Sequence, residues 1–546
     1  MKEILIIISS PFISILSITK PKPKIMKQIL LLSILVFTCF SLNSQTFIRS
    51  ELPTSLATPW EITYSPHGFL WVTEKEGKVS RIDPTNGEKE VVYTAPDYFG
   101  GSPLENSLFC PNLVIGNGTL GLALDPDFAD ESTSFIYFLY SYNSGTEEAP
   151  DTKFRLKRLT WNAVATEVVG DTNIVNEITT GFDHWGGRLM AVKQEGIPYL
   201  FLTIGDNGRS EISGPDCYVP QSENPNNFAQ DVTTQNGKVH RFNTDGTIPE
   251  DNPIPGNSFY TRGHRNPQGL MYNSNLEIIY DIEHGDDTDD EINVLVKGMN
   301  YGWKNVRGYH DDNSFPGEAA YVANYVPNPL VENDALIEPL YSWCTTPDTS
   351  TVGTDWCTVA PSGGIYYGSD AIPEWSNSLL VVTLKDGVST DKEVYQFQLE
   401  ENGDLVPSTV ENPNPKRFFG ADQDQNGRLR DIAVSNDGKT IYLINNGGAP
   451  SSKITVYTYD GGVNTVDPQS LNIRLHPNPA TNQLTVNGLE DIKNLGVIRV
   501  TSLMGESSIV VLDGSNTIDI SRFASGVYFI QIAFSNEIRT LKFVKI

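Results

Sequence analysis

The chain has 546 residues, of which 39% are hydrophobic and 19% are charged, as is ordinary for a soluble globular protein. Its formal net charge of -28 at pH 7 would repel nucleic acid and anionic lipid, so neither is expected as a partner. The 45 glycines and 34 prolines suit many short strands joined by tight turns.

Residues 1–45 are predicted to form a signal peptide region. Lys27 precedes a short apolar run at residues 29–37, and small and polar residues follow it, which is the layout of a secretory signal. Cleavage is expected near Ser44, and an over-extended gene start is kept open for residues 1–25. No later segment is apolar over enough residues to cross a bilayer, so no transmembrane span is expected.

Export would place the cysteines in an oxidising compartment, where disulfides form. Cys39 is expected to leave with the signal, so four of the five cysteines remain. Cys344 and Cys357 are close in sequence and are the favoured pair, and Cys110 with Cys217 is the remaining combination.

Residues 46–462 repeat a pattern of a β-rich run, a turn rich in Gly, Asp and Asn, and another β-rich run. Residues 60–64 lead through such a turn into residues 69–73, and a third run follows at residues 77–82. This spacing is typical of propeller blades. An all-β, six-bladed β-propeller fits best, with seven blades, a β-sandwich or two stacked barrels as alternatives. Later copies are residues 120–124 with 135–140, 189–192 with 199–204, 269–272 with 277–282, 378–383, and 431–435 with 440–444.

The motifs of this region carry the chemistry, and they are GHRNPQG (263–269), DDEIN (289–293), NYGW (300–303), TVAPS (358–362) and GRLRD (427–431). Together they resemble the soluble glucose dehydrogenases that use pyrroloquinoline quinone (PQQ) and the related aldose sugar dehydrogenases. The resemblance extends over roughly residues 52–446. It implies a quinoprotein of the glucose/sorbosone dehydrogenase family, which oxidises the anomeric hydroxyl of an aldose sugar to a lactone by hydride transfer to PQQ.

The resemblance also implies the catalytic residues. His184 resembles the general base, since a neutral imidazole can remove a hydroxyl proton near neutral pH. Asp206 resembles the carboxylate that orients this base, and Asp183 would hold the sugar or the cofactor. Arg265 resembles the arginine beside the quinone, where a guanidinium stabilises developing negative charge. The alternatives are a structural histidine in a turn and a surface arginine.

Because PQQ has three carboxylates, its pocket requires cationic donors. Lys385, Arg428 and Arg430 are the candidates, and Thr358 and Asn266 would add hydrogen bonds. Arg428 and Arg430 alternate along a predicted strand and are expected to project to the same face. A solvated strand face is the alternative for this pair.

Calcium is the second cofactor that the resemblance implies. The main-chain carbonyls of Gly285 and Asp286 are expected to bind it together with PQQ. A second calcium cluster is expected to use Glu291, Tyr301, Arg307, Tyr309 and Asp311. A solvated acidic loop is the alternative for residues 286–291, which lack the spacing of an EF-hand.

The sequence departs from the family pattern near the expected substrate. Gly116 and Asn117 stand where a glutamine usually helps to hold the sugar, and His284 replaces a more usual residue before Gly285. The identity of the aldose therefore stays open.

A linker at residues 463–470 leads to a compact β-module at residues 471–546. The module contains PNPA at 477–480 and SGVYF at 525–529, and it ends on a basic and hydrophobic strand. These features resemble the C-terminal sorting domain of the type IX secretion system, expected as a small Ig-like β-sandwich. The resemblance implies that the secretion machinery carries the protein through the periplasm to the cell surface or the medium.

Two further functions are kept as alternatives. One is a non-catalytic secreted propeller that binds glycans or a protein partner, and the other is a calcium-dependent lactonase. For the dehydrogenase, the absence of a Cys-x-x-Cys-His haem motif in the sequence implies an external electron acceptor. A homodimer is kept open.

Overall fold

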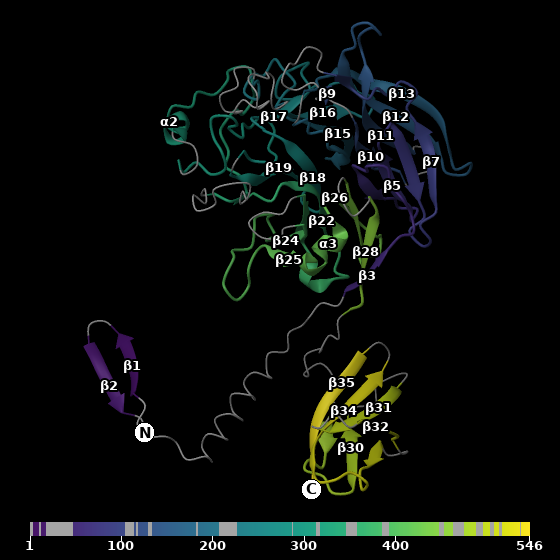
Figure 1. Ribbon diagram of the computed structural model, residues 1–546, viewed down its shortest axis with the longest axis vertical. Coiled ribbons are helices and arrows are strands. Elements are labelled where there is room, and N and C mark those ends of the chain that lie inside the picture. The colour runs from purple at the N-terminus through teal and green to yellow at the C-terminus, as the bar shows by residue number, and fades with distance from the viewer. Residues whose placement is uncertain are drawn as a thin grey trace. The chain divides into compact units, whose positions relative to one another are not determined.

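The computed structural model describes residues 4–9, 12–17, 47–103, 114–115, 118–128, 134–181, 184–206, 227–286, 288–312, 317–345, 358–384, 392–446, 452–461, 474–487, 495–502, 507–512, 516–534 and 537–546. The chain divides into two compact units (Figure 1). One unit is Phe47–Tyr459, and the other combines Met1–Thr46 with Asp460–Ile546.

The unit Phe47–Tyr459 is built from antiparallel sheets, and its described residues contain six sheets of four strands each. The strands, grouped by sheet in pairing order, are β4 (Ile62–Tyr64), β5 (Leu70–Glu74), β6 (Lys78–Ile82) and β7 (Lys89–Thr94); β10 (Thr119–Leu124), β11 (Phe135–Asn143), β12 (Thr152–Asn162) and β13 (Glu167–Ile178); β14 (Leu189–Gln194), β15 (Ile197–Ile204), β16 (Lys238–Asn243) and β17 (Phe259–Arg262); β18 (Pro267–Asn273), β19 (Ile278–Glu283), β20 (Asp290–Val294) and β21 (Tyr341–Trp343); β22 (Pro361–Tyr367), β23 (Ser378–Thr383), β24 (Val394–Gln398) and β25 (Lys416–Phe418); and β26 (Leu429–Val434), β27 (Thr440–Asn445), β28 (Ile454–Tyr459) and β3 (Phe47–Glu51). Minor elements are the pair β8 (Ser102–Pro103) and β9 (Val114–Ile115) and the short helices α2 (Glu318–Ala323) and α3 (Gln423–Asn426).

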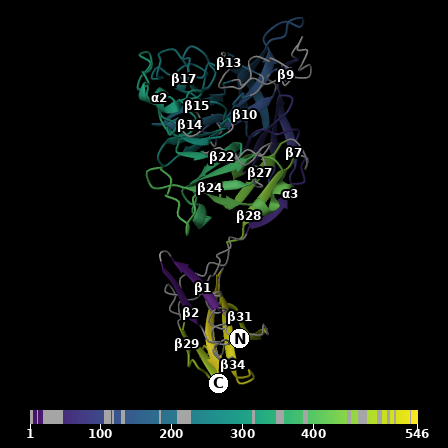
Figure 2. The same ribbon diagram turned by 60° about the vertical axis from the view of Figure 1, so that its left-hand side comes forward.

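The first strands of these six sheets lie next to one another in a closed ring. β4 lies beside β10, which is followed by β14, β18, β22 and β26, and β26 lies beside β4 again. Figure 1 labels β10, β18, β22 and β26, and Figure 2 labels β14. Four-stranded sheets set radially around an axis are the architecture of a β-propeller. The expected all-β fold is therefore confirmed, and the sheets form a propeller ring instead of a sandwich.

Neighbouring sheets bury each other's faces, which explains the apolar runs in the sequence. Every residue of β23 is buried. Leu379 and Val381 of this strand share a hydrophobic cluster with Met271 and Tyr280 of the preceding sheet. A strand that is covered on both faces reads as a continuous apolar run instead of an alternating one. The outer strand β13 has a largely exposed pattern, in contrast to β23.

The last sheet of the ring is assembled from both ends of the unit. β3 comes first in the sequence of the unit, yet it pairs antiparallel with β28, with Phe47 opposite Tyr459 and Glu51 opposite Thr455. The ring is thus closed by hydrogen bonds between residues that are about 400 positions apart.

The other unit contains the β-module that the sequence predicts. One sheet comprises β29 (Arg474–His476), β30 (Gln483–Asn487) and β33 (Thr517–Asp519), and the other comprises β32 (Ser507–Val510), β31 (Leu495–Ser502), β34 (Gly526–Phe534) and β35 (Glu537–Lys545). Both sheets contribute to one core, with Leu484 and Ile518 from the first and Ile530 and Phe543 from the second. β31 and β34 lie side by side in Figure 2. The Ig-like topology stays a prediction.

The N-terminal residues include a hairpin of β1 (Ile4–Ser9) and β2 (Phe12–Ser17). The apolar core of the predicted signal, at residues 29–37, lies outside the described residues. Within the part of the chain that the structure describes, no helix is long and apolar enough to cross a membrane.

Candidate functional site

Several of the predicted site residues that the structure describes lie at strand ends on one face of the propeller. His184 and Arg265 precede the first strands β14 and β18, whereas Asp206 and His284 follow the second strands β15 and β19. In an antiparallel pair the start of one strand lies at the same edge as the end of the next. A cavity of about 420 Å³ opens there, and its lining includes Trp60, Lys75, Tyr98, His184, Trp185, Gln268 and Arg430.

His184 and Asp206 form a hydrogen-bonded pair. The distance from His184 Nδ1 to Asp206 Oδ1 is 2.9 Å, and Asp206 is only 2% exposed. Since a carboxylate can only accept, Nδ1 donates and Nε2 is left as the basic nitrogen. The backbone of His184 adopts the left-handed conformation with φ 50°. Gly205 permits its close approach, because a Cβ on Gly205 would overlap the carbonyl oxygen of His184.

Arg265 is tied to this pair through its own main chain. The carbonyl oxygen of Arg265 accepts the N–H of Asp206 at 2.8 Å, and the N–H of Arg265 donates to Oε2 of Glu283 at 2.8 Å. The Arg265 guanidinium donates to the carbonyl of His284 at 3.2 Å and pairs with Asp286 at 3.3 Å. Nε of Arg265 is buried and has no hydrogen-bond partner among the described residues.

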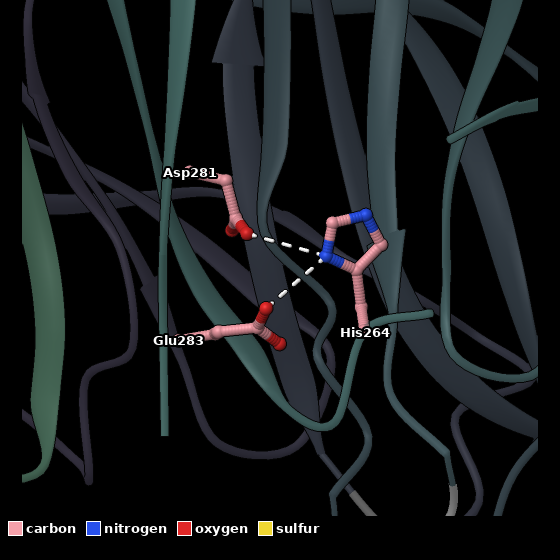
Figure 3. Close-up of side chains that lie close together, drawn as sticks. All are labelled: His264, Asp281 and Glu283. Atoms are coloured by element: carbon pink, nitrogen blue, oxygen red, sulfur yellow. Dashed lines mark hydrogen bonds and ion pairs between the residues drawn. The ribbon is translucent and has the colours of Figure 1, made fainter. Parts of the chain in front are cut away.

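A buried acidic pair holds the histidine next to Arg265. His264 Nδ1 lies 3.2 Å from Glu283 Oε1 and 3.5 Å from Asp281 Oδ2, and Figure 3 shows both carboxylates directed at the imidazole ring. Burial opposes the charged imidazole, but the carboxylates outweigh it and raise the pKa of His264 to about 9. Burial raises the pKa of Asp281 to about 6. This cluster was not expected from the sequence, and it holds Glu283, whose Oε2 accepts the N–H of Arg265.

Asn266 is buried and contacts both neighbouring strand ends. Its Oδ1 accepts the Gln268 amide at 2.7 Å and the N–H of Gly186 at 3.3 Å. Asn266 thus links the loop that carries His184 to the strand that follows Arg265.

Of the predicted cationic donors, Arg428 and Arg430 belong to the described residues. Arg430 is buried and lines the 420 Å³ cavity, with its guanidinium 4.2 Å from the centre of the Trp60 ring. Burial lowers the pKa of Arg430 well below its ordinary value, with Arg188 and Arg428 adding to the effect. Nε of Arg430 has no hydrogen-bond partner among the described residues.

Arg428 differs from Arg430 in its exposure, and the shared face of the two side chains stays a prediction. Arg428 precedes β26, and the strand register shifts between Leu429 and Asp431. Its guanidinium is exposed and donates to the side chain of Asn446 at 2.9 Å. Asn446 itself lines the cavity. Thr358 is buried and is not in the lining.

Most of the residues expected to bind calcium line a second, much smaller cavity of about 10 Å³, which is room for one water molecule or ion. Five of the predicted ligand residues line it: Gly285, Asp286, Glu291, Tyr301 and Arg307. Tyr309 and Asp311 are outside this lining. Asp286 bridges two arginines, at 3.3 Å from Arg265 and 2.9 Å from Arg307.

The alternative of a solvated acidic loop is wrong for the residues next to this cavity. Asp289, Asp290 and Glu291 are buried, and Glu291 accepts the N–H of Gly308 at 2.8 Å. Burial raises the pKa of Glu291 well above its ordinary value, with Glu283 adding to the effect.

Glu318 is a buried acid that was not expected from the sequence. It accepts the N–H of Arg307, and its Oε2 has no hydrogen-bond partner among the described residues. Burial raises the pKa of Glu318 to about 7. A single glutamate in a segment with helical propensity does not indicate, from the sequence alone, that its side chain is buried.

Several predicted residues lie outside the described residues. These are Asp183, Lys385, Gly116, Asn117, Cys39, Cys110, Cys217 and Cys357. Cys344 is disulfide-bonded, and its pairing with Cys357 stays a prediction. Trp60, Lys75 and Trp185 were not predicted although they line the cavity, because single aromatic or basic residues in loops are common elsewhere.

Comparisons with known proteins identify the family of each part of the chain. The family model described as Glucose / Sorbosone dehydrogenase matches residues 56–451, and that of the Secretion system C-terminal sorting domain matches residues 474–546. Quinoprotein glucose dehydrogenase B of Acinetobacter calcoaceticus is 29% identical over 441 residues, 74% of this chain and 86% of that protein. An aldose sugar dehydrogenase of Escherichia coli is 25% identical over 417 residues, 74% of this chain and 91% of its own.

Solved structures share the fold. The PQQ-bound aldose sugar dehydrogenase of Streptomyces coelicolor has a TM-score of 0.51 at 20% identity, covering 76% of this chain and 98% of its own. The apo soluble aldose sugar dehydrogenase of Escherichia coli has a TM-score of 0.54 at 22% identity, covering 76% and 100%. Given the family model that matches most of its length, this chain belongs to the glucose/sorbosone dehydrogenase family and carries a secretion-system C-terminal sorting domain.

Proposed function

We propose that the protein is a secreted quinoprotein that oxidises the anomeric hydroxyl of an aldose sugar to a lactone, with PQQ and calcium as cofactors. The observation that carries the proposal is one cavity that presents a base, His184, and a buried cation, Arg430. The six four-stranded sheets support a six-bladed propeller as its scaffold.

The donors fit a flat, anionic cofactor, with Arg430 in the lining of the 420 Å³ cavity and Arg265 in that of the smaller one. Buried Nε atoms of Arg265 and Arg430 have no hydrogen-bond partner among the described residues, and burying them in that state is costly. Carboxylates of PQQ would satisfy them, with Asn266, Thr358, Lys385 and Arg428 as the further holding residues. When bound, PQQ supplies a quinone that accepts the hydride from the anomeric carbon of the sugar.

The chain's own part in the reaction is to move a proton and to stabilise charge. His184 takes the proton of the anomeric hydroxyl at Nε2, because its Nδ1 is occupied by Asp206 at 2.9 Å. Asp206 stabilises the imidazolium that forms. Arg265, fixed by Glu283 and Asp286, faces the negative charge that develops as the sugar is oxidised. Asp183 is assigned to sugar or cofactor binding.

Buried carboxylates at and near the second cavity fit a divalent cation, with Glu291 in its lining and Glu318 outside it. Glu291 and Glu318 are buried and accept the consecutive main-chain N–H groups of Gly308 and Arg307. Burial raises the pKa of both carboxyl groups, and a calcium ion would offset this cost. Carbonyls of Gly285 and Asp286 would bind the calcium that contacts PQQ, and Tyr301, Arg307, Tyr309 and Asp311 would complete the second cluster.

The sorting domain supports export by the type IX secretion machinery to the cell surface or the medium. A signal peptide within residues 1–45 would direct the first step through the periplasm. Electrons would pass to an external acceptor, since the sequence has no Cys-x-x-Cys-His haem motif.

The test is dye reduction by the purified protein with a panel of aldoses, each with and without PQQ and calcium. We expect sugar-dependent reduction that requires PQQ and falls at least about 1,000-fold in His184→Ala, as when a catalytic base is removed. His67→Ala is the matched control, since His67 is an exposed histidine in the turn between β4 and β5. If no aldose is oxidised with PQQ present, the dehydrogenase proposal fails, and glycan binding in the same cavity becomes the function to test.

A further inference from the structure

The carboxylate of Asp206 is held on both oxygens. Oδ1 accepts from His184, and Oδ2 accepts the indole N–H of Trp303 at 2.7 Å and the side-chain amide of Asn227 at 2.9 Å. Asp206 is 2% exposed, so these donors replace water around the charge. They fix the plane of the carboxylate and therefore the direction in which Oδ1 faces the imidazole.

Trp303 is itself held firmly in place. It is 5% exposed, its main-chain N–H donates to the carbonyl of Gly263 at 3.0 Å, and its carbonyl accepts the Gln230 amide at 2.6 Å. A buried ring with both main-chain groups bonded cannot rotate its N–H away from Asp206 without breaking the local packing.

The ring of Trp303 also contacts the arginine side of the site. Guanidinium carbons of Arg265 and Arg307 lie 5.5 Å and 5.7 Å from the ring centre, and Asp286 bridges the same two arginines. One side chain therefore contacts both the residue that orients the base and the arginine proposed to face the quinone.

We infer that Trp303 is a positioning residue for the reaction: its indole N–H, aided by Asn227, orients Asp206 and so keeps the proton of His184 on Nδ1. The inference rests on the proposed function of His184 as the base. Only the Nδ1–H tautomer leaves Nε2 free to take a proton from the sugar, so loss of the indole N–H reduces the fraction of enzyme that is ready to react.

The kinetic test uses Trp303→Phe in the full chain, which removes the N–H and keeps an aromatic ring beside Arg265. We expect kcat with the best aldose to fall about 10-fold to 100-fold, as for other groups that orient a reacting residue, while KM changes less than about twofold. In an Asp206→Asn background the same substitution should have no further effect, because the residue through which it acts has already been altered.

Trp343→Phe is the matched control. Trp343 is buried in β21, and its indole nitrogen has no hydrogen-bond partner among the described residues. The same change of side chain there removes no hydrogen bond, and kcat should stay within about twofold of the wild type.

A second readout requires no turnover. In protein labelled with ¹⁵N-histidine and free of PQQ, nitrogen shifts report the tautomer of His184, which is assigned among the seven histidines by its loss in His184→Ala. We expect the Nδ1–H form in the wild type and in Trp343→Phe, and a mixture of tautomers in Trp303→Phe. This measurement tests Trp303 even if no sugar is oxidised, so its failure and the failure of the proposed function are separable.

The inference is overturned if the His184 tautomer is the same in Trp303→Phe and wild type, whatever happens to kcat, because Trp303 would then act by another route. It is also overturned if an active wild type and Trp303→Phe have the same kcat, or if Trp303→Phe and Trp343→Phe lose kcat equally.

Discussion

Lys238 is a fully buried lysine whose charge state links folding to pH. Its ammonium group donates to the main-chain carbonyls of Phe228, Ala229 and Asn236. Burial lowers its pKa to about 7 from 10.5. Between these values the unfolded chain binds more protons than the folded one, so this residue makes stability rise as pH rises from 7 towards 10.5.

We therefore expect the wild type to gain about 2 kcal/mol of unfolding free energy relative to Lys238→Met between about pH 7 and pH 9. Denaturant unfolding of both proteins at several pH values measures the difference, in which the titration of all other groups cancels. Parallel pH dependences for the two proteins would contradict a neutral buried Lys238.

At the scale of single residues, sequence reasoning succeeded where a motif fixes both the residue and its partner. The pairing of His184 with Asp206 was expected and is present at 2.9 Å. The roles of Trp303 and Asn227 were not, because their contact with Asp206 depends on how three loops meet in space. The shared face of Arg428 and Arg430 stays a prediction, because Arg428 lies before the strand that begins at Leu429 and the strand register shifts there.

At the scale of elements, strands flanked by turns were predictable and their pairing over long distances was not. Residues 69–73 were expected as a strand and β5 spans Leu70–Glu74, because a short apolar run between turn residues is a local signal. Nothing in residues 47–51 indicates that they complete the sheet of β26, β27 and β28.

This closure makes β3 a testable element. Phe47 packs against Trp375 with ring centres 5.1 Å apart and lies opposite Tyr459. Without β3, that aromatic cluster loses a member and β28 becomes an unpaired edge, which favours association with other chains. A chain that starts at Leu52 should therefore unfold at a temperature lower by several degrees and form aggregates.

The control is a chain that starts at Thr46, which lacks the same N-terminal region but keeps β3. Thermal unfolding and size-exclusion chromatography compare the two. Equal midpoints and equal monomer fractions would mean that β3 does not contribute to closing the ring.

At the scale of the whole molecule, the sequence predicts two parts on either side of the linker at residues 463–470. Each part has its own core. Residues 480–543 supply the core of the β-module, and separate clusters lie between the propeller sheets. What composition does not reveal is how the propeller sheets are joined at the axis. One buried side chain that joins several sheets there is Arg188.

Arg188 connects five of the six sheets. It lies just before β14, pairs with Glu61 beside β4 and, at 3.0 Å, with Asp431 of β26. It also donates to the carbonyls of Gln268 in β18 at 2.9 Å and Ser362 in β22 at 3.2 Å. Its guanidinium is 4% exposed. Burial raises the pKa of Glu61 well above its ordinary value, against the effect of Arg188.

Removing this cation should weaken the whole ring. Arg188→Met would leave Glu61 and Asp431 buried side by side, and breaking a buried ion pair in this way costs about 3–5 kcal/mol. We expect denaturant unfolding to show a loss of that size, and Glu61→Gln added to Arg188→Met to recover part of it, because one of the two like charges is then gone. The contradicting outcome is that the effects of Arg188→Met and Glu61→Gln simply add. The sheets would then be held by their hydrophobic faces alone, with no coupling through the axis.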